Sequence, residues 1–289
     1  MSKSSIVTGI LSLLFYFVFL LLYLHDVIDE LLFLCILFIS LIILFIILFV
    51  FRKKSASKRK ISIAIVILFL LFSYEFLLLG YITQSHLVNL YVEPTQAIEE
   101  SGIYLLAVNK ITLHNKHDDD EIFTTQYDDA LTITKINNRM TYEVKNNQLL
   151  LWLHLKKEPI DETEHNVKIY LSHENIWLSE FFSREQIGGD SAGLGLALTG
   201  LYKRGNIKNQ LPIAVTGAIN EKGDVFPVGY MKEKMQITEK SGIPFMIIPS
   251  ENAEEVTKIQ NELKTNVEIF PVSSVDEATQ LINDLNEKY

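Results

Sequence analysis

The sequence predicts an α+β fold preceded by three transmembrane helices. Two observations lead to this prediction. The first third of the chain holds three long apolar runs, whereas helix-like and strand-like segments alternate after residue 191. Each run is long enough to cross a hydrocarbon core of roughly 30 Å. The three runs, which form a predicted membrane anchor at 1–83, are 6–24, 31–51 and 61–83.

The first run could instead be a cleaved signal peptide. It is too long for the apolar region of a signal peptide, and no small-residue cleavage site follows it. A membrane helix is therefore the preferred interpretation of this run.

The two loops between the apolar runs carry opposite charge. Residues 25–30, "HDVIDE", contain three acidic residues, and residues 52–60, "RKKSASKRK", contain six basic residues. Short loops rich in Lys and Arg stay in the cytoplasm, and this loop would face anionic lipid. The sequence thus predicts a multi-pass protein of the cell membrane, in contact with lipid, whose residues after 83 are extracytoplasmic.

Residues 84–183 are predicted to be a β-rich juxtamembrane segment. A loop at 114–121, "HNKHDDDE", contains two histidines and a run of carboxylates, but its spacing matches no metal-ligand pattern, so no metal site is predicted. Cys35, the only cysteine, lies in the second apolar run. The domain that follows residue 83 has no cysteine and needs no disulfide. β-branched and aromatic residues bounded by polar turns indicate strands at 102–113, 130–136, 148–155 and 166–172.

Residues 184–289 are predicted to form the α+β core. The last helix should open with Ser274 and Glu277, which have the spacing of a capping box. The other predicted helices are 191–204, 230–241 with a stop at Gly242, and one that starts near Asn252. The predicted strands are 211–219, 244–250 and 267–272, with a turn at 220–224.

Charge and membrane position limit the possible functions. Residues 84–289 hold 19 Lys and Arg against 31 Asp and Glu, which argues against a nucleic-acid partner because nothing would neutralise the phosphates. Glu75 lies within the third apolar run, where an ionisable residue is a functional candidate. A carboxyl that is protonated or paired with another helix is the structural alternative. A transporter or channel component, which the three apolar runs and Glu75 together suggest, is the functional one.

Residues 188–200 read "GGDSAGLGLALTG" and place a serine in a glycine-rich stretch before an apolar helix. Leucines follow the last glycine where a phosphate-binding loop needs Lys and Ser/Thr, so the chain has no ATPase motif and no cofactor is predicted. The pattern G-x-S-x-G fits a nucleophile elbow. All seven histidines precede Ser191, however, whereas that fold needs a histidine after its serine. The trypsin-like serine proteases place His first, but their two β-barrels do not suit a helix-rich tail.

A neutral lysine can also activate a serine. In the helix predicted at 230–241, Lys234 shares an apolar face with Met231, Met235 and Thr238, which are spaced three, one and four residues from it. Lys232 lies on another, solvated face. Burial lowers the pKa of an amine, as a general base requires. A Lys234 amine that reaches water past the methionines is the alternative.

The segment 184–282 resembles the proteolytic domain of the Lon family of Ser–Lys peptidases. It is most similar to the membrane-anchored Lon-like proteases that lack an ATPase module. "GGDSAGLGLAL" resembles the family's serine motif. "AVTGAINEKGDVFPVGYMKEKMQITEKSGIPFMIIPSEN" resembles its strand, turn and lysine helix, and "VEIFPVSSVDEA" its closing strand and helix. The separation of serine and lysine in the family selects Lys234, as the helix face does.

The resemblance implies an ATP-independent serine endopeptidase with Ser191 as nucleophile and Lys234 as general base. Thr216 falls where the family has a threonine that hydrogen-bonds the lysine. At the helix start, the backbone N–H groups of Gly189, Asp190 and Ser191 are candidates for an oxyanion hole. Polypeptide substrates and a ring-like homo-oligomer are implied as well.

The sequence departs from the family pattern at three positions, which are expected to alter the substrate groove and leave the dyad in place. Asp190 stands where proline is common, Ala218 replaces a usual glutamate, and Tyr230 replaces a glycine. Two alternatives remain: a catalytically silent Lon-fold scaffold or sensor in the membrane, and a Ser191 that serves only as a helix N-cap.

Overall fold

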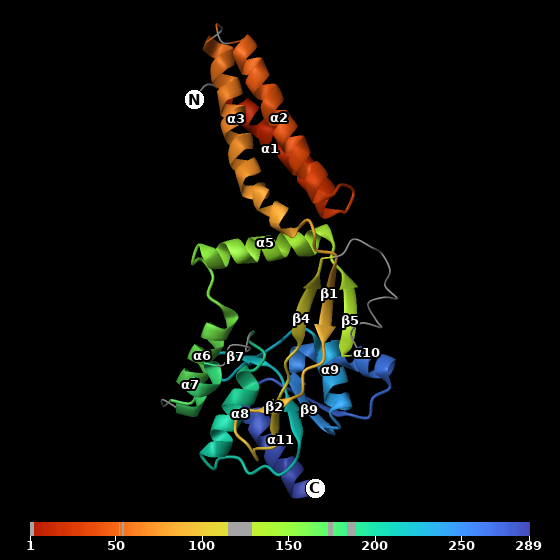
Figure 1. Cartoon of the computed structure of the whole chain (residues 1–289). Coiled ribbons are helices and arrows are strands. Elements are labelled where there is room, and N and C mark those ends of the chain that lie inside the picture. Colours follow the sequence, from red (N-terminus) through yellow and green to blue (C-terminus); the bar gives the residue numbers. More distant parts are fainter. Residues whose placement is uncertain (1–2, 52, 54, 115–128, 173–175, 184–188) are drawn as a thin grey trace. The chain divides into compact units, whose positions relative to one another are not determined.

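The computed structural model describes residues 3–51, 53, 55–114, 129–172, 176–183 and 189–289 (Figure 1). The chain divides into two compact units. Unit 1 comprises Met1–Leu87, Thr112–Asp118 and Thr134–Leu155, and unit 2 comprises Val88–Ile111, Asp119–Ile133 and Lys156–Tyr289. The predicted boundaries near 83 and 183 stay predictions.

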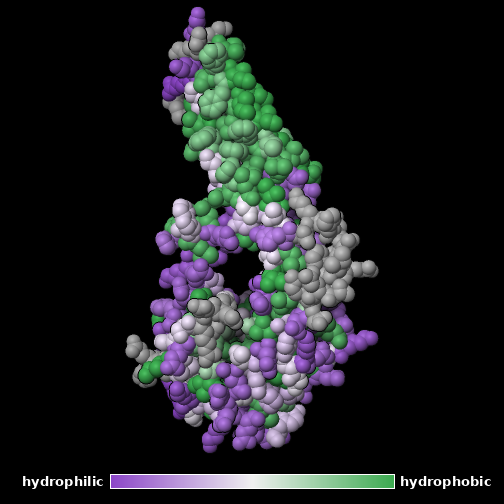
Figure 2. All heavy atoms as spheres, in the orientation of Figure 1, coloured by the Kyte–Doolittle hydropathy of each residue, from purple (hydrophilic) through white to green (hydrophobic). Residues whose placement is uncertain are grey.

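The described residues of unit 1 form mainly helices, together with loops and parts of three strands. The three apolar segments Ile6–Leu24, Glu30–Val50 and Lys58–Tyr81 form helices long and apolar enough to cross a membrane, as predicted. Their visible face is hydrophobic along most of its length (Figure 2). The elements are α1 (Lys3–Leu24), α2 (Glu30–Val50), α3 (Ser55–Glu75), η1 (Phe76–Tyr81) and α5 (Asn138–Trp152).

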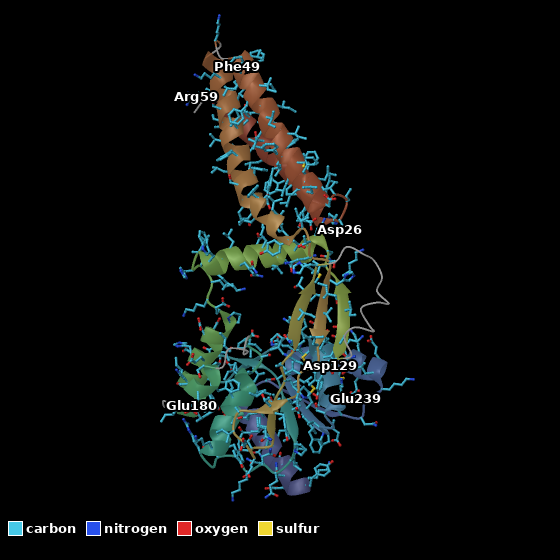
Figure 3. The ribbon with its side chains drawn as sticks, in the orientation of Figure 1. Asp26, Phe49, Arg59, Asp129, Glu180 and Glu239 are labelled. Atoms are coloured by element: carbon cyan, nitrogen blue, oxygen red, sulfur yellow. The ribbon has the colours of Figure 1, made fainter. Side chains whose placement is uncertain are left out.

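The acidic and basic loops lie at opposite ends of the three-helix bundle. Figure 3 shows Asp26 at one end and both Phe49 and Arg59 at the other. Asp29 has a local role in the acidic loop, because its carboxylate accepts a hydrogen bond from the N–H of Leu32 at 2.7 Å and caps α2. The side of the membrane on which each end lies stays a prediction.

Glu75, the ionisable residue of the third apolar segment, is fully buried and paired. Its carboxylate accepts hydrogen bonds from Lys145 at 2.6 Å, Tyr16 at 2.5 Å and Tyr142 at 3.0 Å. Protein groups therefore saturate this carboxylate, as the paired-carboxyl interpretation predicted. Glu75, one of the two features that suggested a transporter, thus has a structural explanation.

Two predicted strands are wrong. Residues 148–155 fall mostly in α5, and residues 166–172 belong to α6 (Pro159–Tyr170). Helix-start signals upstream of each apolar window explain both errors. The Asn137 side chain caps α5 by accepting from the N–H of Met140 at 2.8 Å, and Pro159 occupies the first turn of α6.

The other predicted strands before residue 184 are confirmed with different bounds. Residues 102–113 form two strands, β3 (Ile103–Leu105) and β4 (Asn109–Leu113), and 130–136 forms β5 (Ala130–Lys135). The loop predicted at 114–121 lies, except for His114, outside the described residues. β4 and β5 flank β1 (His86–Leu90) in a three-stranded sheet, and the chain passes between the two units within these strands.

Unit 2 is built on a five-stranded sheet of order β10-β9-β6-β3-β2. β3, β6, β9 and β10 are parallel, and β2 pairs with β3 in the antiparallel direction. A small antiparallel pair, β7 and β8, follows β6. The strands not yet placed are β2 (Thr95–Gln96), β6 (Ile213–Val215), β7 (Ala218–Ile219), β8 (Val225–Phe226), β9 (Phe245–Pro249) and β10 (Glu268–Val272).

Helices cover both faces of this sheet. Alternate strand residues point to opposite faces: Ile213 and Val215 join one buried cluster, whereas Ala214 joins another. The first cluster contains α6, α7 (Ile176–Phe182), α8 (Gly193–Lys203) and α11 (Val275–Lys288). The second contains α9 (Met231–Lys240) and α10 (Ala253–Leu263), which follows η2 (Ser250–Asn252).

The helices and strands predicted after residue 191 are confirmed, with the 211–219 strand divided into β6 and β7. α9 stops before Gly242, whose φ of 66° suits a glycine. The Ser274 hydroxyl accepts from the N–H of Glu277 at 3.1 Å and so caps α11 as expected. The mixed α and β core is therefore confirmed.

Candidate active site

Ser191 lies in the turn that leads into α8. The N-cap of that helix is Ala192, not Ser191. The carbonyl oxygen of Ser191 accepts hydrogen bonds from the N–H of Gly217 at 2.9 Å and from the hydroxyl of Thr216 at 3.4 Å. The serine backbone is thus tied to the segment between β6 and β7, and the interpretation of Ser191 as a helix N-cap is wrong.

The glycines after Ser191 allow α8 to lie close to its neighbours. A Cβ atom on Gly195 would lie 2.3 Å from the side chain of Leu105 in β3, and one on Gly200 would lie 2.4 Å from the side chain of Leu171. Both distances are far below van der Waals contact, so a larger residue would force either the leucine side chain or the helix to shift. The glycine-rich stretch therefore serves helix packing as well as the position of the serine.

Lys234 is buried on α9, with 3% of its surface exposed. Its amine donates a hydrogen bond to the Thr216 hydroxyl at 2.9 Å. Thr216 is fully buried and directly follows β6, where its N–H donates to the carbonyl of Ile247 at 3.1 Å. Lys234, Thr216 and the backbone of Ser191 are therefore linked by consecutive hydrogen bonds.

The topology of the sheet explains why these residues meet. Ser191 precedes a helix on one face of the sheet, and Lys234 comes from a helix on the other face. Both approach the carboxyl end of parallel strand β6, where Thr216 lies. Functional sites in open parallel sheets form at this end of the strands.

The helix face predicted for Lys234 is confirmed. Met231, Met235 and Thr238 are fully buried with it, and Lys232 is exposed and pairs with Glu262 at 3.4 Å. Among the interactions between described residues, no hydrogen bond joins the Ser191 hydroxyl to the Lys234 amine directly. Transfer of a proton between them would require the amine to turn from Thr216 toward the serine.

Burial lowers the pKa of Lys234 to about 8. Asp190 opposes this shift, because its negative charge favours the ammonium form, and Glu233 opposes it less. Lys110 adds to the shift, because its positive charge disfavours a second cation nearby. A lysine of this pKa is roughly one-tenth neutral at pH 7, so the amine can accept a proton near neutrality.

Sequence reasoning missed Glu233, the residue before the lysine. Its carboxylate is buried and accepts hydrogen bonds from the Asn89 amide at 2.8 Å and the Thr132 hydroxyl at 2.5 Å. These partners come from β1 and β5, far away in the sequence. In the sequence, the one sign of a buried carboxylate was an acidic residue between Met231 and Lys234, two members of the predicted apolar face.

Lys110 and Tyr230 were also not recognised as neighbours. The Lys110 amine lies 3.7 Å from the centre of the Tyr230 ring, a cation–π contact. Tyr230 has a φ of 61°, in the left-handed region that favours glycine. This conformation explains why a glycine is usual at the position, and a tyrosine there costs about 1–2 kcal/mol of backbone strain.

The backbone around the serine retains candidate oxyanion donors. Gly193 and Leu194 use their N–H groups on the carbonyls of Asp190 at 3.2 Å and Gly217 at 2.9 Å. Gly189, Asp190 and Ser191 donate to no backbone carbonyl of the described part of the chain, and they stay predicted donors. The described residues contain no group of three His, Cys, Asp or Glu that could hold a metal ion.

Comparison with known proteins identifies the segment that carries this site. Residues 186–283 match the model of the Lon protease (S16) C-terminal proteolytic domain. The chain is 38% identical over 89 residues to Lon protease of Brucella abortus biovar 1 (strain 9-941). The matched residues make up 31% of this chain and 11% of the relative. It is 34% identical over 92 residues to Lon protease of Rickettsia bellii (strain RML369-C), and here the matched residues make up 32% of this chain and 12% of the relative.

The predicted resemblance to a Lon-type proteolytic domain is confirmed by these matches. The matched segment contains Ser191, Thr216 and Lys234 and supports a serine peptidase. The chain spans only about a tenth of the length of the curated relatives it matches, 11% and 12% for these two. The activity and partners of those whole proteins are therefore not assigned to this chain by the match.

Proposed function

We propose that this chain, whose residues 186–283 match a Lon proteolytic domain, is a membrane-anchored serine endopeptidase that works without ATP. Ser191 and Lys234 form its catalytic dyad. The observation that carries the proposal is the buried Lys234 amine, which Thr216 holds beside the turn of Ser191. A buried amine with a pKa near 8 is a base that is available near neutral pH.

In the first step, neutral Lys234 accepts the proton of the Ser191 hydroxyl as the serine oxygen attacks the carbonyl carbon of the scissile peptide. The Thr216 hydroxyl accepts one N–H of the amine and so keeps the nitrogen beside the turn of Ser191, from where the amine turns toward the serine oxygen. The resulting ammonium then gives its proton to the leaving amine. Thr216 is thus a positioning residue.

The products of this step are a free amine and an ester on Ser191. Water attacks that ester, and Lys234 accepts the proton of the water and returns it to the serine oxygen. The N–H groups of Gly189, Asp190 and Ser191 are the proposed donors to the oxyanion in both steps.

We expect the substrates to be polypeptides that are already flexible or misfolded near the membrane. The sequence contains no nucleotide-binding loop that could drive unfolding. A homo-oligomer, as the resemblance to Lon domains implies, would further restrict access to the site. A net negative domain and a membrane anchor leave lipid, not nucleic acid, as the other partner.

The charges of the two loops support an extracytoplasmic peptidase domain. External protease added to intact cells should remove a carboxy-terminal tag. A tag that is protected until the cells are lysed would reverse the proposed topology.

A catalytically silent scaffold or sensor is the second candidate, and the missing direct hydrogen bond between Ser191 and Lys234 favours it. Labelling with a fluorophosphonate, which reacts with activated serines, separates the two candidates. The peptidase proposal expects labelling of the wild-type chain and none of Ser191→Ala. A wild-type chain that is folded, unlabelled and inactive on unfolded polypeptides would support the scaffold.

A further inference from the structure

α5 attaches to the bundle of apolar helices along one face. The Asn138 side chain donates hydrogen bonds to the carbonyl of Tyr23 at 2.7 Å, in the last turn of α1, and to the carbonyl of Ile28 at 2.8 Å, in the loop between α1 and α2. One helical turn after Asn138, Tyr142 donates to Glu75. About two turns after Asn138, Lys145 forms the buried ion pair with the same carboxylate. The first half of α5 is therefore held firmly against the bundle.

The ion pair also fixes the rotation of α5 about its axis. The Lys145 amine lies 4.0 Å from the ring centres of both Tyr74 and Tyr142 and 2.6 Å from the Glu75 carboxylate. Both partners are almost fully buried, at 1% and 0% exposure. A buried pair that loses one partner leaves an uncompensated charge, so α5 cannot rotate freely while the pair persists.

The same face of α5 continues past the bundle to Trp152. Trp152 is the seventh residue after Lys145. At 100° per residue, its side chain points within about 20° of the direction of the Lys145 side chain. In Figure 1, α5 crosses the end of the bundle and extends beyond it. Trp152 is 74% exposed, and the next apolar residues, Leu153 and Leu155, are 46% and 71% exposed.

We infer that the end of α5 rests on the membrane surface, with Trp152, Leu153 and Leu155 at the boundary between lipid headgroups and acyl chains. This inference depends on the proposed insertion of the three apolar helices. The face of α5 that carries Lys145 contacts the bundle. Where α5 extends beyond the bundle, the same face points toward the lipid that surrounds the bundle. Trp prefers this boundary because its ring is apolar and its N–H is polar. Lys156 and Lys157 follow directly and suit the headgroup layer.

Trp152 can be observed directly, because the chain has only one other tryptophan, Trp177. Trp177 is 9% exposed and belongs to the core cluster of unit 2. The full-length chain is placed in phosphatidylcholine vesicles that contain lipid brominated either near the headgroup end or near the methyl end of its acyl chains. Bromine quenches tryptophan fluorescence by contact, and subtraction of the Trp152→Phe spectrum isolates the Trp152 emission.

We expect the Trp152 emission to be lost with the shallow bromine and to decrease less with the deep bromine. The remaining emission of Trp152→Phe should be unchanged in both lipids. Emission from Trp152 that neither lipid quenches, or that only the deep bromine quenches, would overturn the inference.

Flotation of the same vesicles after an alkaline wash tests membrane insertion separately. A chain that floats but shows no quenching refutes only the placement of α5. A chain that does not float refutes the membrane anchor of the proposed function.

Discussion

The pH dependence of cleavage tests the role of Lys234 most directly. If the neutral amine takes the serine proton, kcat/KM follows the neutral fraction of Lys234 in the free enzyme. With a pKa of about 8, that fraction rises from roughly 0.1 at pH 7 to roughly 0.9 at pH 9. We therefore expect kcat/KM to increase about tenfold over this interval and then to level off.

A lysine whose pKa stayed near 10.4 would give a different profile. Its neutral fraction would rise about a hundredfold between pH 7 and pH 9 and would still be rising at the upper limit. The assay is continuous cleavage of a fluorogenic, unstructured polypeptide by the full-length chain in vesicles. A rise that continues without a plateau would refute the burial argument, and a flat profile would refute the neutral base.

Two nearby charges allow the same profile to be shifted in opposite directions. Asp190 stabilises the ammonium form of Lys234, so Asp190→Asn should lower the midpoint. Lys110 destabilises that form, so Lys110→Gln should raise the midpoint. Lys232→Gln changes a charge on the exposed side of α9 and is the matched control, with no expected shift. Shifts in the same direction for both variants would contradict the electrostatic account.

Three further predictions concern the charge of the catalytic lysine, the packing of α8 and the buried ion pair of the helix bundle. Lys234→Arg should abolish cleavage, because a guanidinium stays protonated, whereas Lys232→Arg should keep near wild-type kcat/KM in the same assay. Gly195→Ala places a Cβ atom 2.3 Å from a side chain of β3 and should cost about 1–3 kcal/mol by overpacking, measured as a lower Tm. Lys145→Met leaves the buried Glu75 carboxylate without its cation and should cost about 3–5 kcal/mol, measured by thermal unfolding in detergent.

Matched variants separate these effects from general damage. Gly229→Ala meets no atom within 4 Å and should leave the Tm unchanged. Arg139→Met removes an exposed ion pair with Glu143 of 3.2 Å and should cost less than about 1 kcal/mol. Equal losses for Gly195→Ala and Gly229→Ala, or for Lys145→Met and Arg139→Met, would contradict the packing and ion-pair arguments.

Local patterns in the sequence predicted much of the fold. The three apolar helices follow from the length of the apolar runs. A run long enough to cross a bilayer must hydrogen-bond all of its own backbone groups where water is absent, and a helix does so within one segment. The period of the lysine helix separated Lys234 from Lys232, because residues three and four apart share a face. The capping box at Ser274 marked the start of the last helix. Each of these features depends on residues that are neighbours in the sequence.

The same local reasoning failed at 148–155 and 166–172, where short apolar runs do not distinguish a strand from a helix. The capping residue Asn137 and the first-turn residue Pro159 decide both segments, and both lie outside the apolar windows.

Only the tertiary structure decided which distant groups meet and how far they are removed from water. Glu233 lies 144 residues from Asn89, and Glu75 lies 70 residues from Lys145. The lowered pKa of Lys234 also depends on the burial of its amine in the folded domain, where Asp190 and Lys110 are brought near it. Desolvation and pairing are properties of the folded environment, whereas helix period and run length are properties of the chain. The sequence by itself therefore determined the candidate residues, and the tertiary structure determined the chemistry available to them.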